Sequence, residues 1–365
     1  MKKFLIIVMA AMFAVSLSAQ MRVWVGGQVD YEKDLSQIDS ITFVKATDAG
    51  DTAAVNPNLS QHVFTVNAEG GQVYFSQGNL QYNAATNVWR FAENQYDYVG
   101  EDNALASSTY SGWIDLFGWG TSGWNNTAND PFAVNYQPWS TSRTPTNIVV
   151  SGERSIISIN CEMLAITGHC DTVWSEAGYM YSNGVNTYGY GPSFNQTDVN
   201  LTGTSANHDW AVYNAIQNGG KEPGLWRTML LEEWEYILND RPLAQYLRSQ
   251  ATVCGVHGYI LLPDDFTLPQ GLTWSYKTNN WDTNTYNTET WAVMERAGAV
   301  FLPAAGQRAG VETQRFNQVG DYWTATYDYN EERTARRFCF NESDAAMAWD
   351  WRFAAFSIRP VQDVE

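Results

Sequence analysis

Apolar and polar residues alternate along much of the chain, and this period of two predicts β-strands. Between residues 62 and 92 three such runs, 62–66, 72–82 and 88–92, are separated by Gly and Asn, which is typical of hairpins. Four more strand patterns follow residue 298, at 299–304, 321–327, 335–340 and 356–361. The pattern therefore predicts β-sheet in residues 62–92 and again after residue 298.

Three segments show a helical spacing instead. The first is 209–217 and ends before two glycines, and the third is 289–297, with Trp291 and Met294 on one face. The second begins at Thr228 as N-cap, carries an apolar stripe that includes Trp234, and stops at Pro242. We expect Trp234 to be a core anchor. Residues 100–150 and 175–205 show no helical period and are predicted to be long structured loops.

The first 19 residues combine Lys2 and Lys3 with an apolar run from Phe4 to Val15 and small residues up to Ala19. This arrangement is typical of a secretory signal peptide, and its apolar run is shorter than the roughly 18–20 residues that a membrane-spanning helix needs. No later stretch supplies such a run. The chain is therefore predicted to be exported, with periplasm, cell surface and medium as open alternatives.

A leader precedes the main domain. Residues 21–27 and 40–44 are predicted to be two short strands joined by a polar turn at 31–37, and residues 45–60 have the composition of a linker. This gives a signal peptide at 1–19, a β leader and linker at 20–56, and one main domain at 57–365.

The charge balance argues against one class of partner. The net charge is −18 for the whole chain and becomes −20 once Lys2 and Lys3 are removed with the signal peptide. An acidic surface repels phosphate backbones, so no nucleic acid is expected as partner. The 16 Trp and 20 Tyr residues exclude a disordered chain and indicate a large packed domain.

Cysteine and histidine usage gives no sign of a cofactor or metal. Cys161 and Cys170 are close enough in sequence for a disulfide, which stays open, while Cys254 and Cys339 stand alone. Their spacing fits no metal motif, and the four histidines are scattered. No G-x-S-x-G turn is present, although two glycosidase carboxylates would leave no sequence trace. We expect neither metal nor cofactor.

The segment 226–238 carries a family resemblance. Its sequence WRTMLLEEWEYIL is similar to the R-L-P-T-E-x-E-W-E-Y segment of the formylglycine-generating enzyme superfamily, matched at Arg227, Thr228, Glu233, Trp234, Glu235 and Tyr236. The blocks GYILLPDDF, AVFLPAAGQR, DYWTAT and FSIRPV also resemble, in order, the Fibrobacter succinogenes major paralogous domain and cover roughly 203–361. The resemblance implies an exported protein of the Bacteroidetes kind with an α+β, C-type-lectin-like fold: a mixed twisted sheet, two or three helices and long loops.

The enzymes of that superfamily use a pair of cysteines and a copper ion, and this pair is missing here, because Cys339 is the only cysteine in the C-terminal region. C-type lectins bind sugars through calcium with an E-P-N or Q-P-D triplet, but this chain has Glu222-Pro223-Gly224. The resemblance therefore favours a binding protein over an enzyme, and calcium-dependent sugar binding is not supported.

The candidate binding face follows from the same resemblance. In lectin-like variable proteins the stretch before the final S-V-R-P-V-like strand carries the ligand contacts, and here it is rich in aromatic residues. The candidate residues are Tyr327, Asp328, Tyr329, Asn330, Trp349, Asp350, Trp351, Arg352 and Phe353. Such residues make binding hot spots. The alternative is that Trp349, Trp351 and Phe353 form one buried face of a strand.

The sequence thus predicts an exported, non-catalytic protein that recognises a protein or glycan outside the cytoplasm, in adhesion or surface assembly. Two alternatives stay open. One is an enzyme of the sulfatase-modifying or carbohydrate-active type. The other is a structural subunit of a surface assembly whose residues 21–44 supply an edge strand to a partner. The oligomeric state is not predicted.

Overall fold

The computed structural model describes residues 62–124, 137–141, 200–328 and 334–364, and the backbone of the strands at 20–25 and 28–34. The chain divides into two units, residues 1–57 and residues 58–365. The predicted signal peptide, the predicted linker, and Cys161 and Cys170 lie outside the described residues.

In the described residues of the first unit, β1 (Gln20–Val25) and β2 (Gln28–Asp34) form an antiparallel hairpin. The predicted polar turn at 31–37 is wrong in part, because 31–34 belong to β2. The sequence between the two strands is Gly26-Gly27, the residue type that two-residue hairpin connections favour. The strand predicted at 40–44 lies outside the described residues.

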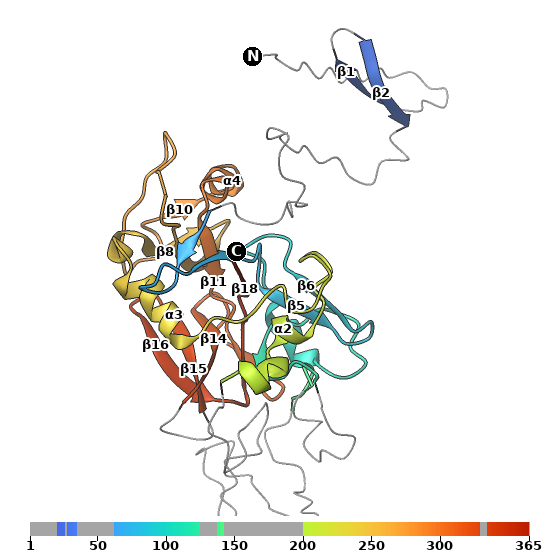
Figure 1. The fold of residues 1–365 in the computed structure, drawn as a ribbon, viewed down its shortest axis with the longest axis vertical. Helices are drawn as coiled ribbons and strands as arrows, with labels where there is room; N and C mark the ends of the chain where they lie inside the picture. Colours follow the sequence, from blue (N-terminus) through green and yellow to red (C-terminus); the bar gives the residue numbers. More distant parts are fainter. Residues whose placement is uncertain are drawn as a thin grey trace, which may run out of the picture. The chain divides into compact units, whose positions relative to one another are not determined.

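The second unit has a mixed α+β architecture in which short sheets predominate (Figure 1). Its strands are β3 (Phe64–Thr65), β4 (Gln72–Phe75), β5 (Leu80–Asn83), β6 (Val88–Phe91), β7 (Phe117–Gly118), β8 (Arg248–Val253), β9 (Val256–Leu261), β10 (Thr285–Tyr286), β11 (Val300–Pro303), β12 (Gln307–Ala309), β13 (Glu312–Gln314), β14 (Val319–Tyr327), β15 (Thr334–Asn341), β16 (Ala345–Trp351), β17 (Ala354–Phe356) and β18 (Val361–Asp363). The strands β3 to β6, β11, β14 and β15 lie in segments whose alternation predicted them, and β17 and β18 overlap the run predicted at 356–361. Alternation did not predict β8, β9, β10, β12 or β13, and β16 was expected only as the alternative for 349–353. β7 lies inside the loop predicted at 100–150.

The sheets are connected in a way that brings the two ends of this unit together. Their strand orders are β10-β8-β9-β11, β13-β12-β17-β7, β14-β15-β16, β18-β4-β3 and β5-β6. All pairs are antiparallel except β10 with β8. The last strand, β18, pairs with β4 near the start of the unit, with Val361 opposite Phe75.

The helices are short. They are α2 (Trp210–Tyr213), α3 (Leu231–Glu235) and α4 (Thr288–Arg296); a π-helical turn, Tyr236–Asp240, continues α3, and 3-10 turns occupy Gly100–Leu105, Gly203–His208 and Ala244–Tyr246. The prediction for the third helix is confirmed within one residue at each end. Among the described residues, no helix is long and apolar enough to cross a membrane.

The two other helix predictions need correction. The first helix ends at Tyr213 and not near residue 217, because the chain turns extended at Asn214, whose amide donates to the Trp210 and Ser122 carbonyls. The second begins at Leu231, not at Thr228. The Thr228 hydroxyl donates to the Asp209 carboxylate instead of capping the helix.

The core is built around tryptophans. Trp234 on α3 is 1% exposed and stacks on Phe338 of β15 at 5.2 Å, with Phe75 of β4 on another side. α4 buries Trp291 against Phe301 of β11. The prediction that Trp234 is a core anchor is confirmed.

Candidate functional site

Three aromatic side chains form a row at the C-terminal end of β16 and just beyond it. Trp349 and Trp351 meet edge to face with ring centres 6.5 Å apart, and Trp351 and Phe353 lie with parallel planes at 6.3 Å. Their spacing of two residues puts Trp349 and Trp351 on one face of the strand. Trp349 is 51% exposed, and the other two are half-buried. We call these three residues the aromatic row.

The aromatic row continues a face that is core elsewhere. Met347 of β16 lies opposite Phe338 of β15 and packs into the core with it, beneath α3. α3 is short, and the strands run on past it (Figure 1). The same face is therefore covered at Met347 and open at Trp349. The alternative that these aromatic residues form a buried face is wrong for Trp349.

Arg336 is a member of this face that the sequence reasoning missed. It lies directly opposite Trp349 in the β15–β16 ladder, so both side chains project on the same side. Its guanidinium lies 3.9 Å from Asp328 and is one quarter exposed. Only the register of the two strands could have revealed it, because Arg336 and Trp349 are distant in sequence.

The candidate residues at 327–330 do not join the aromatic row. Tyr327 and Asp328 are 6% and 3% exposed, so they belong to the core and not to an open binding face. The Asp328 carboxylate accepts a hydrogen bond from the Thr334 hydroxyl at 3.1 Å, which joins the end of β14 to the start of β15. Tyr329 and Asn330 lie outside the described residues.

Within the candidate stretch 349–353, Arg352 and Asp350 do not belong to the aromatic row either. Arg352 is fully buried, and its carbonyl accepts the Trp119 amide at 2.9 Å. Asp350 projects from the opposite face of β16, as alternation requires, and pairs with Arg337 at 3.2 Å. Of the nine predicted residues, Trp349, Trp351 and Phe353 therefore come together as a partly open surface.

An ion network lies on the face of the sheet behind the aromatic row. Arg337 of β15 bonds to Asp321 of β14 and to Asp350 of β16, so one guanidinium joins all three strands. Burial raises the pKa of Asp321 to about 6 although Arg337 lowers it, and burial also raises the pKa of Asp350. The network thus links β16, which carries the aromatic row, to β15 and β14.

Cys339 lies on this back face, opposite Asp321. It is a free thiol that donates weakly to the Ala346 carbonyl at 3.4 Å, and burial raises its pKa, so the reactive thiolate is disfavoured. Cys254 is also free. The described ranges contain no group of three or more His, Cys, Asp or Glu side chains placed to hold a metal ion.

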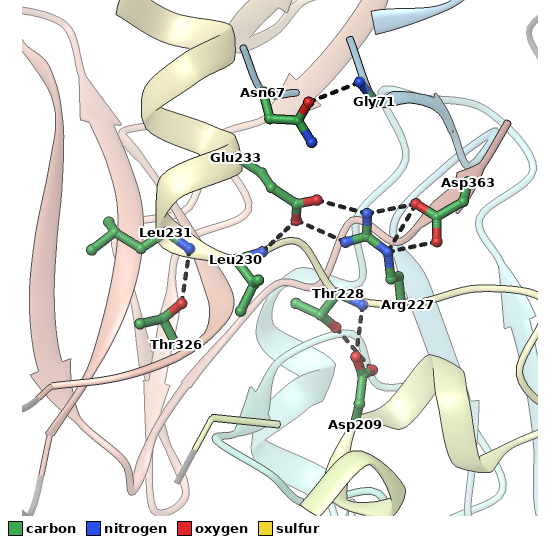
Figure 2. A network of polar contacts seen from close by, with 10 residues as sticks. All are labelled: Asn67, Gly71, Asp209, Arg227, Thr228, Leu230, Leu231, Glu233, Thr326 and Asp363. Carbon is green, nitrogen blue, oxygen red and sulfur yellow. Dashed lines mark hydrogen bonds and ion pairs between the residues drawn. The ribbon is translucent and has the colours of Figure 1, made fainter. Parts of the chain in front are cut away.

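The residues that carry the family resemblance form a second network (Figure 2). Arg227 donates to both oxygens of Glu233 at 2.7 Å and to Asp363 of β18 at 2.6 Å. Glu233 also accepts the Leu230 amide at 2.8 Å, which satisfies one free N–H at the start of α3. The network ties the segment before α3 to the helix and to the last strand.

Thr228 extends the second network toward α2. Its amide and hydroxyl donate to the Asp209 carboxylate at 2.7 and 2.9 Å, and Asp209 also caps α2 through the Ala211 amide. The acidic partners hold the pKa of Arg227 above its usual value. The motif residues Arg227, Thr228 and Glu233 therefore position structural elements and present no open site.

One further surface was not predicted from the sequence. Tyr246 and Tyr276 meet edge to face at 4.5 Å, and both are exposed. Nearby in sequence, Leu243 is exposed with a left-handed backbone (φ 62°). Tyr246 and Tyr276 are 30 residues apart, so no sequence pattern links them. They provide a useful comparison for the aromatic row.

Comparison with known protein families, with curated proteins and with solved structures found no match to this chain.

Proposed function

We propose that this chain is an exported, non-catalytic binding protein with a C-type-lectin-like domain, and that the aromatic row is its ligand contact. The observation that carries the proposal is the half-exposed Trp349 on a face that is otherwise core. Leaving a tryptophan half in water forgoes part of its burial energy, which a ligand that covers the ring would recover.

The composition of the surface supports binding. Trp and Arg are the residue types most enriched among binding hot spots, and the surface combines Trp349 and Trp351 with Arg336. Flat, rigid rings lose little conformational entropy on contact, and they suit the apolar face of a sugar as well as an apolar side chain. The ligand classes proposed are thus a protein or a glycan outside the cytoplasm.

The support beneath the surface also favours recognition. The row lies on a strand held by the Arg337 network and not on a long loop, so its geometry is fixed before the ligand arrives. The mixed sheets, short helices and long connections of the second unit agree with the lectin-like fold that we propose. Export by a cleaved signal peptide forms part of the proposal.

The test is a glycan array together with a cell-surface binding screen, using the full chain. For any ligand found, Trp349→Ala and Trp351→Ala should each weaken binding by about 2 kcal/mol, or roughly thirtyfold. Tyr276→Ala is the matched control, because it removes an equally exposed ring from a different surface.

The two outcomes are distinct. Loss of binding in both tryptophan variants, with wild-type affinity in Tyr276→Ala, supports the aromatic row as the contact. Wild-type affinity in both tryptophan variants would show that the ligand binds elsewhere. Circular dichroism on each variant confirms that the fold is retained.

A further inference from the structure

The strand that carries Trp349 is an open edge. β16 pairs with β15 on one side, and within the described ranges no strand pairs with its other side. An unpaired edge exposes a row of main-chain N–H and C=O groups that can accept another strand.

The direction of these main-chain groups follows from the β15–β16 turn. The Asn341 amide donates to the Asp344 carbonyl at 2.9 Å, so this pair is hydrogen-bonded across the hairpin. Pairs alternate along an antiparallel ladder, so Ala345, Met347, Trp349 and Trp351 stand in non-hydrogen-bonded pairs. Their N–H and C=O groups point outward, away from β15.

Side-chain carboxylates mark both ends of this outward edge. Asp344 accepts the Ala345 amide at 2.8 Å, and Asp350 accepts the Trp351 amide at 2.8 Å. These two bonds show that the Ala345 and Trp351 amides face away from β15, as the alternation of the ladder requires for Met347 and Trp349 as well. Between them no residue in the described part of the chain bonds to the outward main-chain groups of Met347 and Trp349, which defines a short docking stretch.

The edge lacks the usual protection against another strand. Proteins commonly block an edge with Lys, Pro or an inward-pointing charge. The sequence of β16, AAMAWDW, contains one charge, Asp350, which Arg337 holds on the back face. Ala346 and Ala348 are small, so a second strand can approach closely on that face.

We propose that β16 binds an extended peptide segment of a partner protein by strand addition. The main chain of Met347 and Trp349 pairs with the peptide, and the aromatic row contacts every second peptide side chain. This rests on the proposed function, since it uses the same surface, and it names the ligand class. Main-chain pairing supplies affinity, and the row supplies specificity.

Charge selects among the possible occupants. The chain has a net charge of −18, and Glu342 and Asp344 are exposed at the turn that leads into β16. A second copy of the chain would bring like charge against like charge, whereas a peptide with basic residues would be attracted. The expected occupant is therefore a neutral or basic extended peptide.

The experiment compares two substitutions at one position. Peptides are selected on the full-length chain from a phage-displayed linear dodecapeptide library, synthesised, and titrated by calorimetry. Trp349→Ala removes the ring and keeps the N–H, while Trp349→Pro removes both. Because this N–H points outward, proline at 349 leaves the β15 ladder intact.

We expect Trp349→Pro to bind the peptide at least about tenfold more weakly than Trp349→Ala, the effect of losing one main-chain hydrogen bond and gaining a steric block. Ala348→Pro serves as the geometric control, because it removes an inward ladder bond and should lower the melting temperature far more. Scanning the peptide with N-methyl groups should abolish binding at alternate positions only, whatever the stability of the protein variants.

Equal affinities of Trp349→Ala and Trp349→Pro, or a uniform N-methyl scan, would overturn strand addition while leaving aromatic contact in force. Ligands found only on a glycan array would do the same. Self-association of the wild type that Trp349→Pro abolishes would overturn the peptide as occupant and assign the edge to a second copy of the chain. Wild-type peptide affinity in Trp349→Ala and Trp351→Ala would instead refute the proposed function.

Discussion

The α3 region and the end of β16 contain the same kinds of residue in opposite situations. In each, an arginine bonded to two carboxylates ties down the element that carries a tryptophan: Arg227 holds α3 with Trp234, and Arg337 holds β16 with Trp349. Trp234 is 1% exposed and Trp349 is 51% exposed. Residue type alone therefore does not separate an anchor from a contact, and the cover provided by neighbouring elements decides it.

The largest expected effect is the loss of unfolding free energy when the buried Trp234 is removed. Trp234→Ala removes a ring that packs on Phe338 and Phe75, and we expect it to cost about 3–5 kcal/mol of unfolding free energy. Chemical denaturation of the full chain measures this. A cost below about 1 kcal/mol would mean that α3 does not hold the core.

The second network should be the next most sensitive. Arg227→Ala leaves the Glu233 carboxylate, 13% exposed, without its main partner, and we expect a cost of about 2 kcal/mol. Arg227→Lys should recover little of it, because lysine cannot make the bidentate contact. Asp363→Asn is the control, since Asp363 is 64% exposed and should change stability by less than about 1 kcal/mol.

The pH dependence of the unfolding free energy can test the buried α3 region through His208, which precedes Asp209 of the second network. Burial lowers the pKa of His208 to about 3, below the ordinary 6.5, so the unfolded chain takes up the proton first. The contribution of His208 to stability is therefore present above pH 6.5 and is lost as pH falls. Between pH 7 and pH 5 the wild type should lose about 2 kcal/mol more than His208→Gln.

Comparing the wild type with His208→Gln cancels the contributions of other titrating groups. Burial raises the pKa of Asp115 and Asp321 to about 6, and their protonation changes stability in the opposite direction over part of the same range. Both carboxyls are present in the wild type and in His208→Gln, so they cancel. Parallel curves for the two proteins would contradict the assignment to His208.

The smallest expected effect concerns Trp349 itself. Trp349→Ala should change the unfolding free energy by less than about 1 kcal/mol, because half of the ring is already in water and the strand is an edge. A loss comparable with that of Trp234→Ala would remove the contrast between the two regions.

The sequence predicts local structure here better than it predicts the site. Alternation predicts β3 to β6, β11, β14 and β15 but not β8, β10 or β13, while the apolar stripe gives the burial of Trp234 and the extent of α4. The start of α3 was misplaced because Thr228, a good N-cap by type, bonds to Asp209, a partner supplied by tertiary structure.

The candidate site depends on tertiary contacts, which the alternation of apolar and polar residues along a strand does not predict. Alternation predicts that Trp349 and Trp351 share a face, but whether α3 covers that face depends on the length of the helix and on where it crosses the sheet. Arg336 joins the surface only through the β15–β16 register. Tyr327 and Asp328 have the residue types of a binding loop but lie in the core at the end of β14.

The position of β18 bears on how the second unit acquires its structure. β18 lies between β4 and the segment at Arg227, with Val361 opposite Phe75 and hydrogen-bonded to the main chain of Arg227. The strand near residue 75 therefore cannot complete its pairing until a segment almost 300 residues further along the chain has been synthesised. Such distant pairing slows folding and favours a late, cooperative closure once the whole unit has been released. A chain that stops short of residue 361 would leave both β4 and the approach to α3 without their common neighbour.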